Sequence, residues 1–308
     1  MSSDHESLAA EDIRDVYRHI LGRMPSDAEV ATWLTKKFTL AQMRNSFLAS
    51  VEFGKVYENA TGKTNWTASA AQVIINIRIP KTAGTSLTSI IARSFQADAV
   101  LYTDDADLSN LMRLGASERL KVRMVAGHIQ YGIGALFPQR VLYVTMLRTP
   151  LERIYSFYRY VRRTQDHPLN RLFLTEDMTF GEFLEQALTN YHIRREVDNG
   201  QVRRLAGDMT GASFPDTALL YRRAAHNLFA SNMLFGVASN FEGFLRRLVA
   251  EGIIPKATQL HSNSSPGGET SLDEVMSNMT EYQLELARYF TYWDDLLYTG
   301  ASAAISTD

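Results

Sequence analysis

The stretch that decides the fold is residues 79–87, Ile-Pro-Lys-Thr-Ala-Gly-Thr-Ser-Leu. It directly follows a β-branched run at 73–77 and directly precedes a segment with a helical pattern. A strand that stops at a proline, turns through a glycine and feeds a helix start rich in Thr and Ser points several backbone N–H groups at one place. The stretch therefore predicts a phosphate or sulfate site after the first strand of an α/β domain.

The side chains and the backbone of this turn both suit an anion. Lys81 supplies a positive charge, and Gly84 lets the backbone approach the anion closely. Because Lys81 comes before Gly84, the order differs from the Gly-x-x-x-x-Gly-Lys-Ser/Thr of ordinary nucleoside triphosphate loops. The alternative interpretation is a surface turn that carries a lysine and leads into a capped helix. The candidate anion ligands are Lys81, Thr82, Ala83, Gly84, Thr85 and Ser86.

The composition is that of an ordinary globular protein. The chain has 308 residues, of which 45% are hydrophobic and 21% charged, and its formal net charge of −2 gives no reason to expect nucleic acid as a partner. Cysteine is absent, which excludes disulfides and thiolate catalysis. The seven histidines show no metal-ligand spacing, so no metal is expected.

The sequence also bears on the protein's location. Its first residues are acidic and contain no apolar signal region. No stretch approaches the length of about 18 uncharged apolar residues that a membrane-spanning helix needs. We therefore expect no transmembrane segment and a cytoplasmic protein.

The first part of the chain, residues 8–58, predicts a small helical domain. Apolar residues recur at one-sided helical spacing in three short segments, the last of which runs to Val51. Capping boxes at Ser26–Glu29 and Thr39–Gln42 mark the starts of the second and third segments. The motif Tyr-Arg-x-Ile-Leu-Gly-Arg-x-Pro, which begins at Tyr17, resembles a bacterial domain of unknown function, the one numbered 4214 in families of that name.

The rest of the chain predicts one α/β domain at 72–298, after a small and polar linker at 59–71. Strand and helix patterns alternate along it, which predicts a parallel sheet wrapped by helices. The small residues of 299–308 predict a flexible tail. The expected strands are 73–79, 122–126, 141–147 and 234–237, and the expected helices are 84–96, 149–163, 179–188, 196–206, 240–250 and 272–297.

A second anion site is predicted where the strand 141–147 ends. Arg148 follows this strand, and Ser156 comes about two turns into the helix that Pro150 begins, so both can face one anion. Six arginines against two acids between positions 148 and 171 make a local positive excess in an acidic protein. The alternative for the later arginines is a solvated helix face.

His128 is the candidate for proton transfer. It lies in Ala-Gly-His-Ile-Gln-Tyr-Gly at 126–132, directly after another predicted strand. The carboxyl ends of parallel strands form the ligand-binding edge of such a sheet, and an imidazole titrates near neutral pH. His128 therefore suits the removal of a proton from a hydroxyl at this edge, although a lone histidine is more often structural.

Together these segments resemble the PAPS-dependent sulfotransferases of the carbohydrate type, in particular bacterial family-2 and heparan-sulfate 2-O-sulfotransferase-like enzymes. PAPS is 3′-phosphoadenosine 5′-phosphosulfate. The resemblance spans 72–298 and implies a P-loop-like three-layer α/β domain with a central parallel sheet. It implies that the 79–87 turn holds the 5′-phosphosulfate, with Lys81 on the leaving phosphate. It also implies that Arg148 and Ser156 hold the 3′-phosphate and that His128 is the base. Thr149 departs from the family, which commonly has Asp there.

Two weaker segments fit the same resemblance. Residues 198–207, Asp-Asn-Gly-Gln-Val-Arg-Arg-Leu-Ala-Gly, resemble an Asn-x-x-x-Arg-x-Leu-x-Gly stretch of the family. By this resemblance Asn199 and Arg203 touch the acceptor or the nucleotide; alternatively, they cap and pair within a helix. Residues 261–268 are placed like a loop that often closes over the nucleotide in such enzymes.

The sequence thus favours a sulfotransferase that moves the sulfuryl group from PAPS to a hydroxyl of a carbohydrate or glycoconjugate, such as a glycan or glycolipid. The products are a sulfate ester and PAP, and no metal is required. A nucleotide-dependent phosphoryl transferase should instead have a lysine after the last glycine and a magnesium-binding acid at a strand end, whereas the strand 141–147 is followed by Arg148. The remaining alternative is a non-catalytic nucleotide- or glycan-binding protein on the same fold.

Overall fold

The computed structural model describes residues 8–61, 72–104, 108–173, 178–208, 217–257 and 270–306. The predicted loop at 261–268 and most of the predicted linker lie outside these ranges. The chain divides into two compact units. Unit 1 comprises residues 1–75, 95–126 and 132–142, and unit 2 comprises 76–94, 127–131 and 143–308.

The N-terminal helices of unit 1 begin where the sequence places their caps. The Ser26 N–H donates to the Glu29 carboxylate at 2.8 Å, and the Thr39 N–H donates to the Gln42 side chain at 2.9 Å, so both predicted capping boxes are confirmed. The helices are α1 (Ala10–Val16), which continues as a π-helical turn (Tyr17–Leu21), α2 (Asp27–Leu34), α3 (Leu40–Leu48) and α4 (Val51–Thr61).

The third predicted helix is in fact two helices. Its expected continuation to Val51 is wrong, because the Ser50 hydroxyl accepts the Phe53 N–H at 3.1 Å and begins α4 after α3 has ended. Val51 is consequently 79% exposed. The buried side chains of α1 to α4 form one cluster, which Leu120 of α7 (Ala116–Lys121) joins. The helical segment therefore packs on another element of unit 1.

The strands form a five-stranded sheet in the order β2-β3-β1-β4-β5. β2 pairs with β3 and β4 pairs with β5 in parallel, with Val100 opposite Met124 and Tyr143 opposite Met233. The predicted α/β class with a central parallel sheet is confirmed, and the sequence missed only the three-residue β2. The strands are β1 (Gln72–Ile77), β2 (Val100–Tyr102), β3 (Met124–Gly127), β4 (Arg140–Leu147) and β5 (Met233–Val237).

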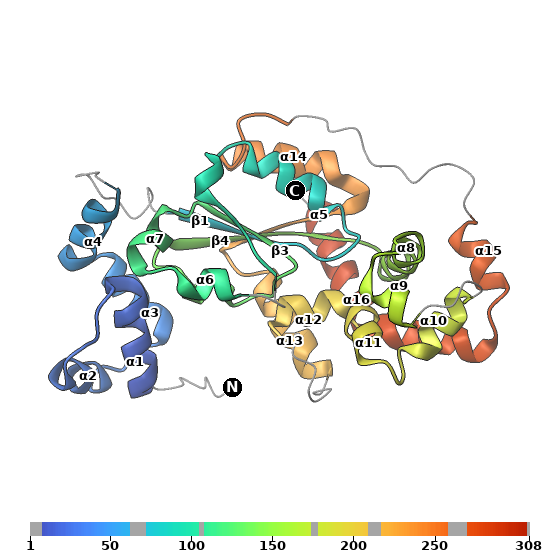
Figure 1. Ribbon diagram of the computed structural model, residues 1–308, viewed down its shortest axis with the longest axis horizontal. Coiled ribbons are helices and arrows are strands. Elements are labelled where there is room, and N and C mark those ends of the chain that lie inside the picture. The colour runs from blue at the N-terminus through green and yellow to red at the C-terminus, as the bar shows by residue number, and fades with distance from the viewer. Residues whose placement is uncertain are drawn as a thin grey trace. The chain divides into compact units, whose positions relative to one another are not determined.

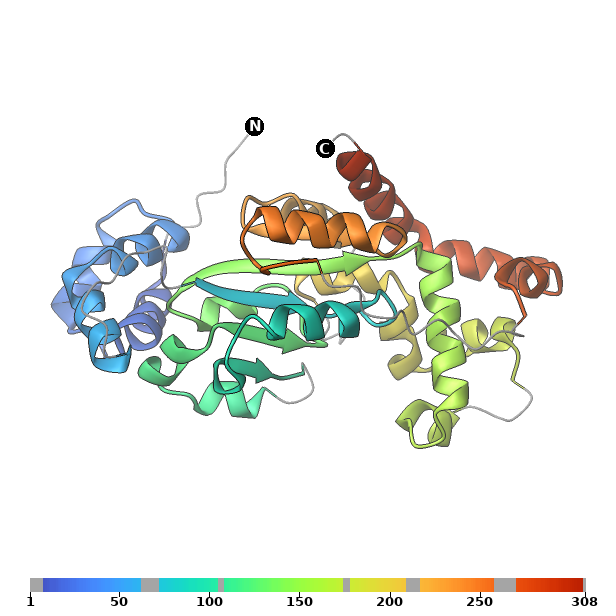
Figure 2. The ribbon, with the colours of Figure 1, turned by 90° about the horizontal axis from the view of Figure 1, so that it is seen from above.

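Helices of unit 2 cover its strands on both faces. In Figure 1, α5 (Gly84–Ala92) and α14 (Phe241–Ala250) lie on one side of the strands, and α12 (Gly200–Ala206) and α13 (Thr217–Leu228) on the other. Figure 2, seen from above, shows α5 and α14 in front of the strands. This is the three-layer arrangement that the resemblance implies, and in such sheets ligands bind at the carboxyl ends of the strands.

A helical subassembly extends unit 2 beyond the carboxyl end of β4. Its apolar cluster is centred on side chains such as Phe183 and Phe290, which are fully buried. No helix in the described ranges is long and apolar enough to cross a membrane. The helices are α8 (Pro150–Arg163), α9 (Pro168–Phe173), α10 (Phe180–Gln186), α11 (Tyr191–Val197), α15 (Leu272–Ser277) and α16 (Glu281–Ser306).

The last helix is longer than the sequence suggests. A flexible tail is expected from residue 299, yet α16 continues to Ser306. Ala301 is fully buried, and a Cβ at Gly300 would lie 3.8 Å from the Phe229 ring. The small residues at 299–304 therefore let the helix pack closely, which composition alone does not distinguish from a disordered end.

Candidate functional site

The turn between β1 and α5 has the backbone of an anion-binding loop. Lys81 and Ala83 both adopt left-handed conformations, with φ of 69° and 67°, although neither is glycine. The Thr82 hydroxyl between them donates to the Ile79 carbonyl at 2.9 Å. Alternating right- and left-handed residues turn successive N–H groups to one side, which creates a concave site for an anion. The strain of two such residues is typical of a functional site.

The strain at Ala83 gives a stability prediction. Replacing Ala83 by Gly should stabilise the protein by about 1 kcal/mol, because a left-handed conformation costs a side-chain-bearing residue about 1–2 kcal/mol more than it costs glycine. The matched control is Ala225→Gly inside α13, which should destabilise by about 1 kcal/mol, since glycine is the poorer helix former. Urea unfolding measures both changes, and a loss of stability in Ala83→Gly would contradict the conformation described for this turn.

Arg78 stands beside this turn and was missed by sequence reasoning. Its Nη2 donates to the Thr85 hydroxyl at 2.9 Å, at the first turn of α5. A Cβ on Gly84 would lie 3.4 Å from the Cβ of Arg78, so a larger residue there would crowd this side chain. Arg78 lies two positions before Pro80, and its place at a strand end was the signal that the sequence offered.

Lys81 lies in a concentration of positive charge. Its Nζ is 4.4 Å from the centroid of the Tyr160 ring in α8. Burial lowers the pKa of Lys81, and the guanidinium groups of Arg163, Arg148 and Arg159 lower it further. Four cations gathered around a concave backbone site repel one another, so an anion with several charges is the ligand that would stabilise them.

Arg148 contacts the turn that contains Lys81, and Ser156 lies further along α8. The Arg148 Nη1 donates to the Lys81 carbonyl at 3.3 Å, and its Nε is 3.4 Å from the Glu152 carboxylate. Positions 152, 156 and 160 are each four residues apart, so they lie along one face of α8. At one end of this face, Glu152 contacts Arg148, and at the other end the Tyr160 ring contacts Lys81. Arg148 and Lys81 therefore come together, and the spacing places Ser156 on the face of α8 that contacts both.

His128 follows β3 and is fixed to the end of β1. The Arg78 N–H donates to the Gly127 carbonyl at 2.9 Å, and the His128 Nδ1 is 2.9 Å from the Arg78 carbonyl. Because a carbonyl only accepts, this contact places a proton on Nδ1 and leaves the lone pair of the neutral ring on Nε2. His128 is thereby held in the tautomer that a base at the carboxyl edge of the sheet requires.

Asn199 and Arg203 lie in the interior instead. Both are 2% exposed. The Asn199 Oδ1 accepts the N–H groups of Trp293 and Asp294 at 2.8 and 3.1 Å, and Arg203 Nη2 donates to the Asp198 carboxylate at 2.9 Å. The contacts fit the alternative of capping and pairing within the fold.

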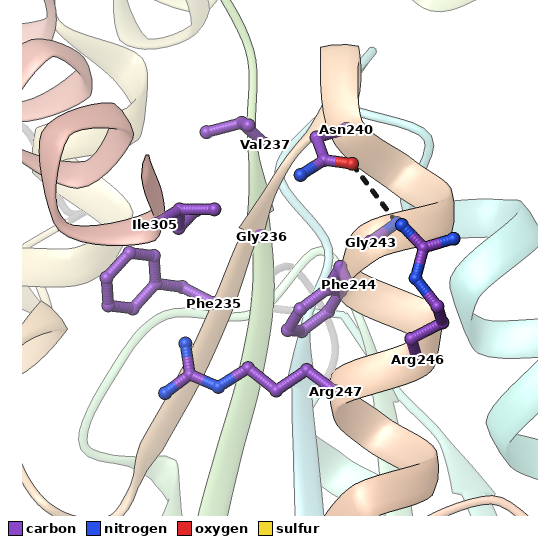
Figure 3. A pocket seen from close by; sticks show the side chains of 9 residues that line it. All are labelled: Phe235, Gly236, Val237, Asn240, Gly243, Phe244, Arg246, Arg247 and Ile305. Atoms are coloured by element: carbon purple, nitrogen blue, oxygen red, sulfur yellow. Dashed lines mark hydrogen bonds between the residues drawn. The ribbon is translucent and has the colours of Figure 1, made fainter. Parts of the chain in front are cut away.

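Cavities occur at two places among the described residues of unit 2 that bear on the site. Figure 3 shows one of about 370 Å³ beside β5, between α14 and the end of α16, lined by Phe235, Val237 and Arg247 among others and by none of the predicted site residues. The second, of about 460 Å³, lies along α8 and is likewise lined by none of the predicted site residues. Its lining does include Arg159 and Arg163, whose charges lower the pKa of Lys81.

Comparison with known proteins finds a family similarity over the segment that carries this site. The model of the sulfotransferase family matches residues 65–210, a segment that contains the β1–α5 turn, His128, Arg148 and Ser156. Among solved structures, the chain is similar to mouse sulfotransferase SULT7A1 complexed with PAP, with 16% identity, coverage of 79% of this chain and 92% of that chain, and a TM-score of 0.39. No curated protein sequence matches the chain. The segment that carries the site is therefore similar to the sulfotransferase family.

Proposed function

We propose that the protein is a PAPS-dependent sulfotransferase that acts on a hydroxyl of a carbohydrate or glycoconjugate. The observation that carries the proposal is the contact of Arg148 with Lys81 on the strained turn after β1, within the segment that matches the sulfotransferase family. The helix spacing places Ser156 on the adjoining face of α8. This set of groups fits the donor, because PAPS carries a phosphosulfate at one end of its ribose and a second phosphate on the 3′-oxygen.

The donor would be bound by two groups of residues. The N–H groups and hydroxyls of residues 82–86, together with the Lys81 ammonium, would hold the 5′-phosphosulfate. Arg148 and Ser156 would hold the 3′-phosphate. Lys81 would neutralise the charge that develops on the 5′-phosphate as the bond between its oxygen and sulfur breaks, a form of electrostatic stabilisation worth several kcal/mol.

His128 would act on the acceptor. Its Nε2 takes the hydroxyl proton while the hydroxyl oxygen forms the new bond to sulfur, so that a sulfate ester, PAP and a protonated imidazole result. The hydrogen bond from Nδ1 to the Arg78 carbonyl orients the ring and is retained when the ring becomes positively charged.

The cavity along α8 supports a sugar-sized acceptor. It measures about 460 Å³ and is lined by the guanidinium groups of Arg159, Arg162 and Arg163 and by the polar side chains of Asn278 and Gln283. Guanidinium and amide groups can donate hydrogen bonds to the hydroxyls of a sugar. A carbohydrate acceptor is therefore the class that we propose first.

Nucleotide binding tests the proposal. Calorimetry should show PAP binding that ATP competes with only weakly, and a screen with labelled PAPS should reveal transfer to a carbohydrate hydroxyl. Equal competition by ATP would favour a phosphoryl transferase. PAP binding without transfer to any acceptor of a broad panel would favour a non-catalytic binding protein.

The lowered pKa of Lys81 predicts how PAP affinity depends on pH. The ammonium form binds phosphate, so the affinity is present at neutral pH and is lost as pH rises through the pKa of Lys81, which lies below the ordinary 10.5. Calorimetry of PAP binding from neutral pH to about pH 10 measures the loss. In the control Lys81→Arg, the guanidinium stays charged over this range and the alkaline loss should disappear. A loss of the same size in both proteins would contradict this assignment.

A further inference from the structure

We propose that Gln201 is a positioning residue of the donor site, which fixes the backbone of Arg148 and so sets the preference for a nucleotide that carries a 3′-phosphate. The inference rests on the proposed function, because it assigns the 3′-phosphate to Arg148.

The Gln201 side chain closes a pair of hydrogen bonds around a single residue. Its Oε1 accepts the Arg148 N–H at 3.0 Å, and its Nε2 donates to the Arg148 carbonyl at 2.9 Å. Gln201 is 1% exposed and Arg148 is half-buried, so the two bonds are shielded on the Gln201 side, where a polar group without a partner is costly. Together they fix both backbone dihedrals of Arg148, at the point where β4 has ended and α8 has not yet begun.

Gln201 is itself held from a distant part of the chain. The carboxylate of Asp294 in α16 accepts the N–H groups of Gln201 and Val202 at 3.1 and 2.7 Å, which caps the start of α12. The Asn199 N–H also donates to the Phe290 carbonyl at 2.7 Å. The amide that clamps Arg148 therefore projects from a helix end that is fastened to α16.

This arrangement acts on one part of the nucleotide. A guanidinium recognises a phosphate through paired hydrogen bonds whose geometry depends on where its backbone stands. Without the two hydrogen bonds to Gln201, the Arg148 guanidinium should bind the 3′-phosphate more weakly, while the turn at 79–87 still binds the 5′-phosphate. The selectivity between PAP and adenosine 5′-monophosphate, which lacks the 3′-phosphate, is therefore the property that Gln201 controls.

The test compares Gln201→Ala with a matched control, Gln139→Ala. Gln139 is also 1% exposed, and its Nε2 also donates to backbone carbonyls, those of Arg119 and Val122. Calorimetry on each full-length variant gives the dissociation constants of PAP and of adenosine 5′-monophosphate. The ratio that measures selectivity is the dissociation constant of adenosine 5′-monophosphate divided by that of PAP. We expect this ratio to fall about tenfold in Gln201→Ala, the equivalent of one or two hydrogen bonds, and to stay unchanged in Gln139→Ala.

Two further variants make the test decisive. In an Arg148→Ala background, Gln201→Ala should change the ratio by less than about twofold, because its effect passes through Arg148. Gln201→Glu keeps the acceptor for the Arg148 N–H but loses the donor to the carbonyl, and it should also lower the ratio. A folded Gln201 variant with the wild-type ratio overturns the proposal. So does unfolding of both Gln201 variants while Gln139→Ala folds, because Gln201 would then be only structural.

A failure of the proposed function can be distinguished from a failure of the inference on Gln201. If the wild-type protein binds no PAP, the assignment of the donor is wrong whatever Gln201 does. The hydrogen bond from the Arg148 N–H to Gln201 can be tested without nucleotide by measuring amide hydrogen exchange at Arg148. Exchange at this amide should accelerate in Gln201→Ala and not in Gln139→Ala, and equal rates in the wild type and Gln201→Ala would remove the physical basis of the inference.

Discussion

Replacement of His128 by Ala is expected to lower kcat for PAPS-dependent transfer on the order of 10²–10⁴-fold, the usual contribution of a general base. PAP affinity should change by less than about twofold, because the groups that we assign to the nucleotide are those of residues 81–86, Arg148 and Ser156. The measurement is transfer of labelled sulfate from PAPS to the best acceptor of a screen, together with calorimetry of PAP binding.

His19 provides the matched control for this substitution. It too is half-buried, and its Nδ1 is 2.7 Å from the backbone carbonyl of Asp15, the same kind of contact that His128 makes with Arg78. His19→Ala should therefore show any general cost of removing an anchored imidazole, with kcat unchanged. If His128→Ala retains PAPS-dependent transfer, another group takes the proton and the assigned base is wrong.

Replacement of Asp294 by Ala is expected to cost about 3–5 kcal/mol of the free energy of unfolding. Asp294 is completely buried, and its Oδ2 is 3.7 Å from the guanidinium of Arg153, which is completely buried as well. Its carboxylate also caps α12 through Gln201 and Val202. The substitution leaves a buried cation without its counter-ion and two N–H groups without acceptors.

Urea unfolding at neutral pH, followed by circular dichroism, measures this loss. The control is Asp295→Ala at the next position, where the side chain is exposed and the loss should stay below about 1 kcal/mol. Equal losses in the two variants would show that the ion pair and the cap contribute nothing beyond an ordinary surface substitution.

The pH dependence of stability gives a second measurement on Asp294. Burial raises the pKa of Asp294 from 3.8 to about 6, although Arg153 opposes the shift. Between these values the folded protein binds more protons than the unfolded chain, so this group makes stability fall as pH rises from about 4 to about 6. In Asp294→Asn this part of the pH dependence should be absent. A wild-type profile in that variant would assign the titration to another group.

The local parts of the fold could be predicted because their causes are local. The capping boxes at Ser26 and Thr39 join residues three apart, and both form as expected. The turn at 79–87 follows from a strand, a proline, a glycine and a helix start in immediate succession. The break at Ser50 and the helical course of 299–306 were missed, since a serine can either lie inside a helix or begin a new one, and small residues suit a packed helix as well as a flexible end.

For the candidate site, the sequence by itself determined the types of residue and the strand ends that carry them. Lys81, His128 and Arg148 each come at or just after the carboxyl end of a predicted strand, and in a parallel sheet such ends lie at one edge. The four-residue spacing on α8 likewise follows from helix geometry.

Only the tertiary structure decided how these residues are held. The clamp of Gln201 on Arg148 joins positions 53 residues apart, and the cap of Asp294 on α12 joins positions 93 apart. It also decided that Asn199 and Arg203 are interior residues. Contacts across such distances arise when helices pack, and packing depends on the shapes of all the buried side chains together, which no short pattern in the sequence records.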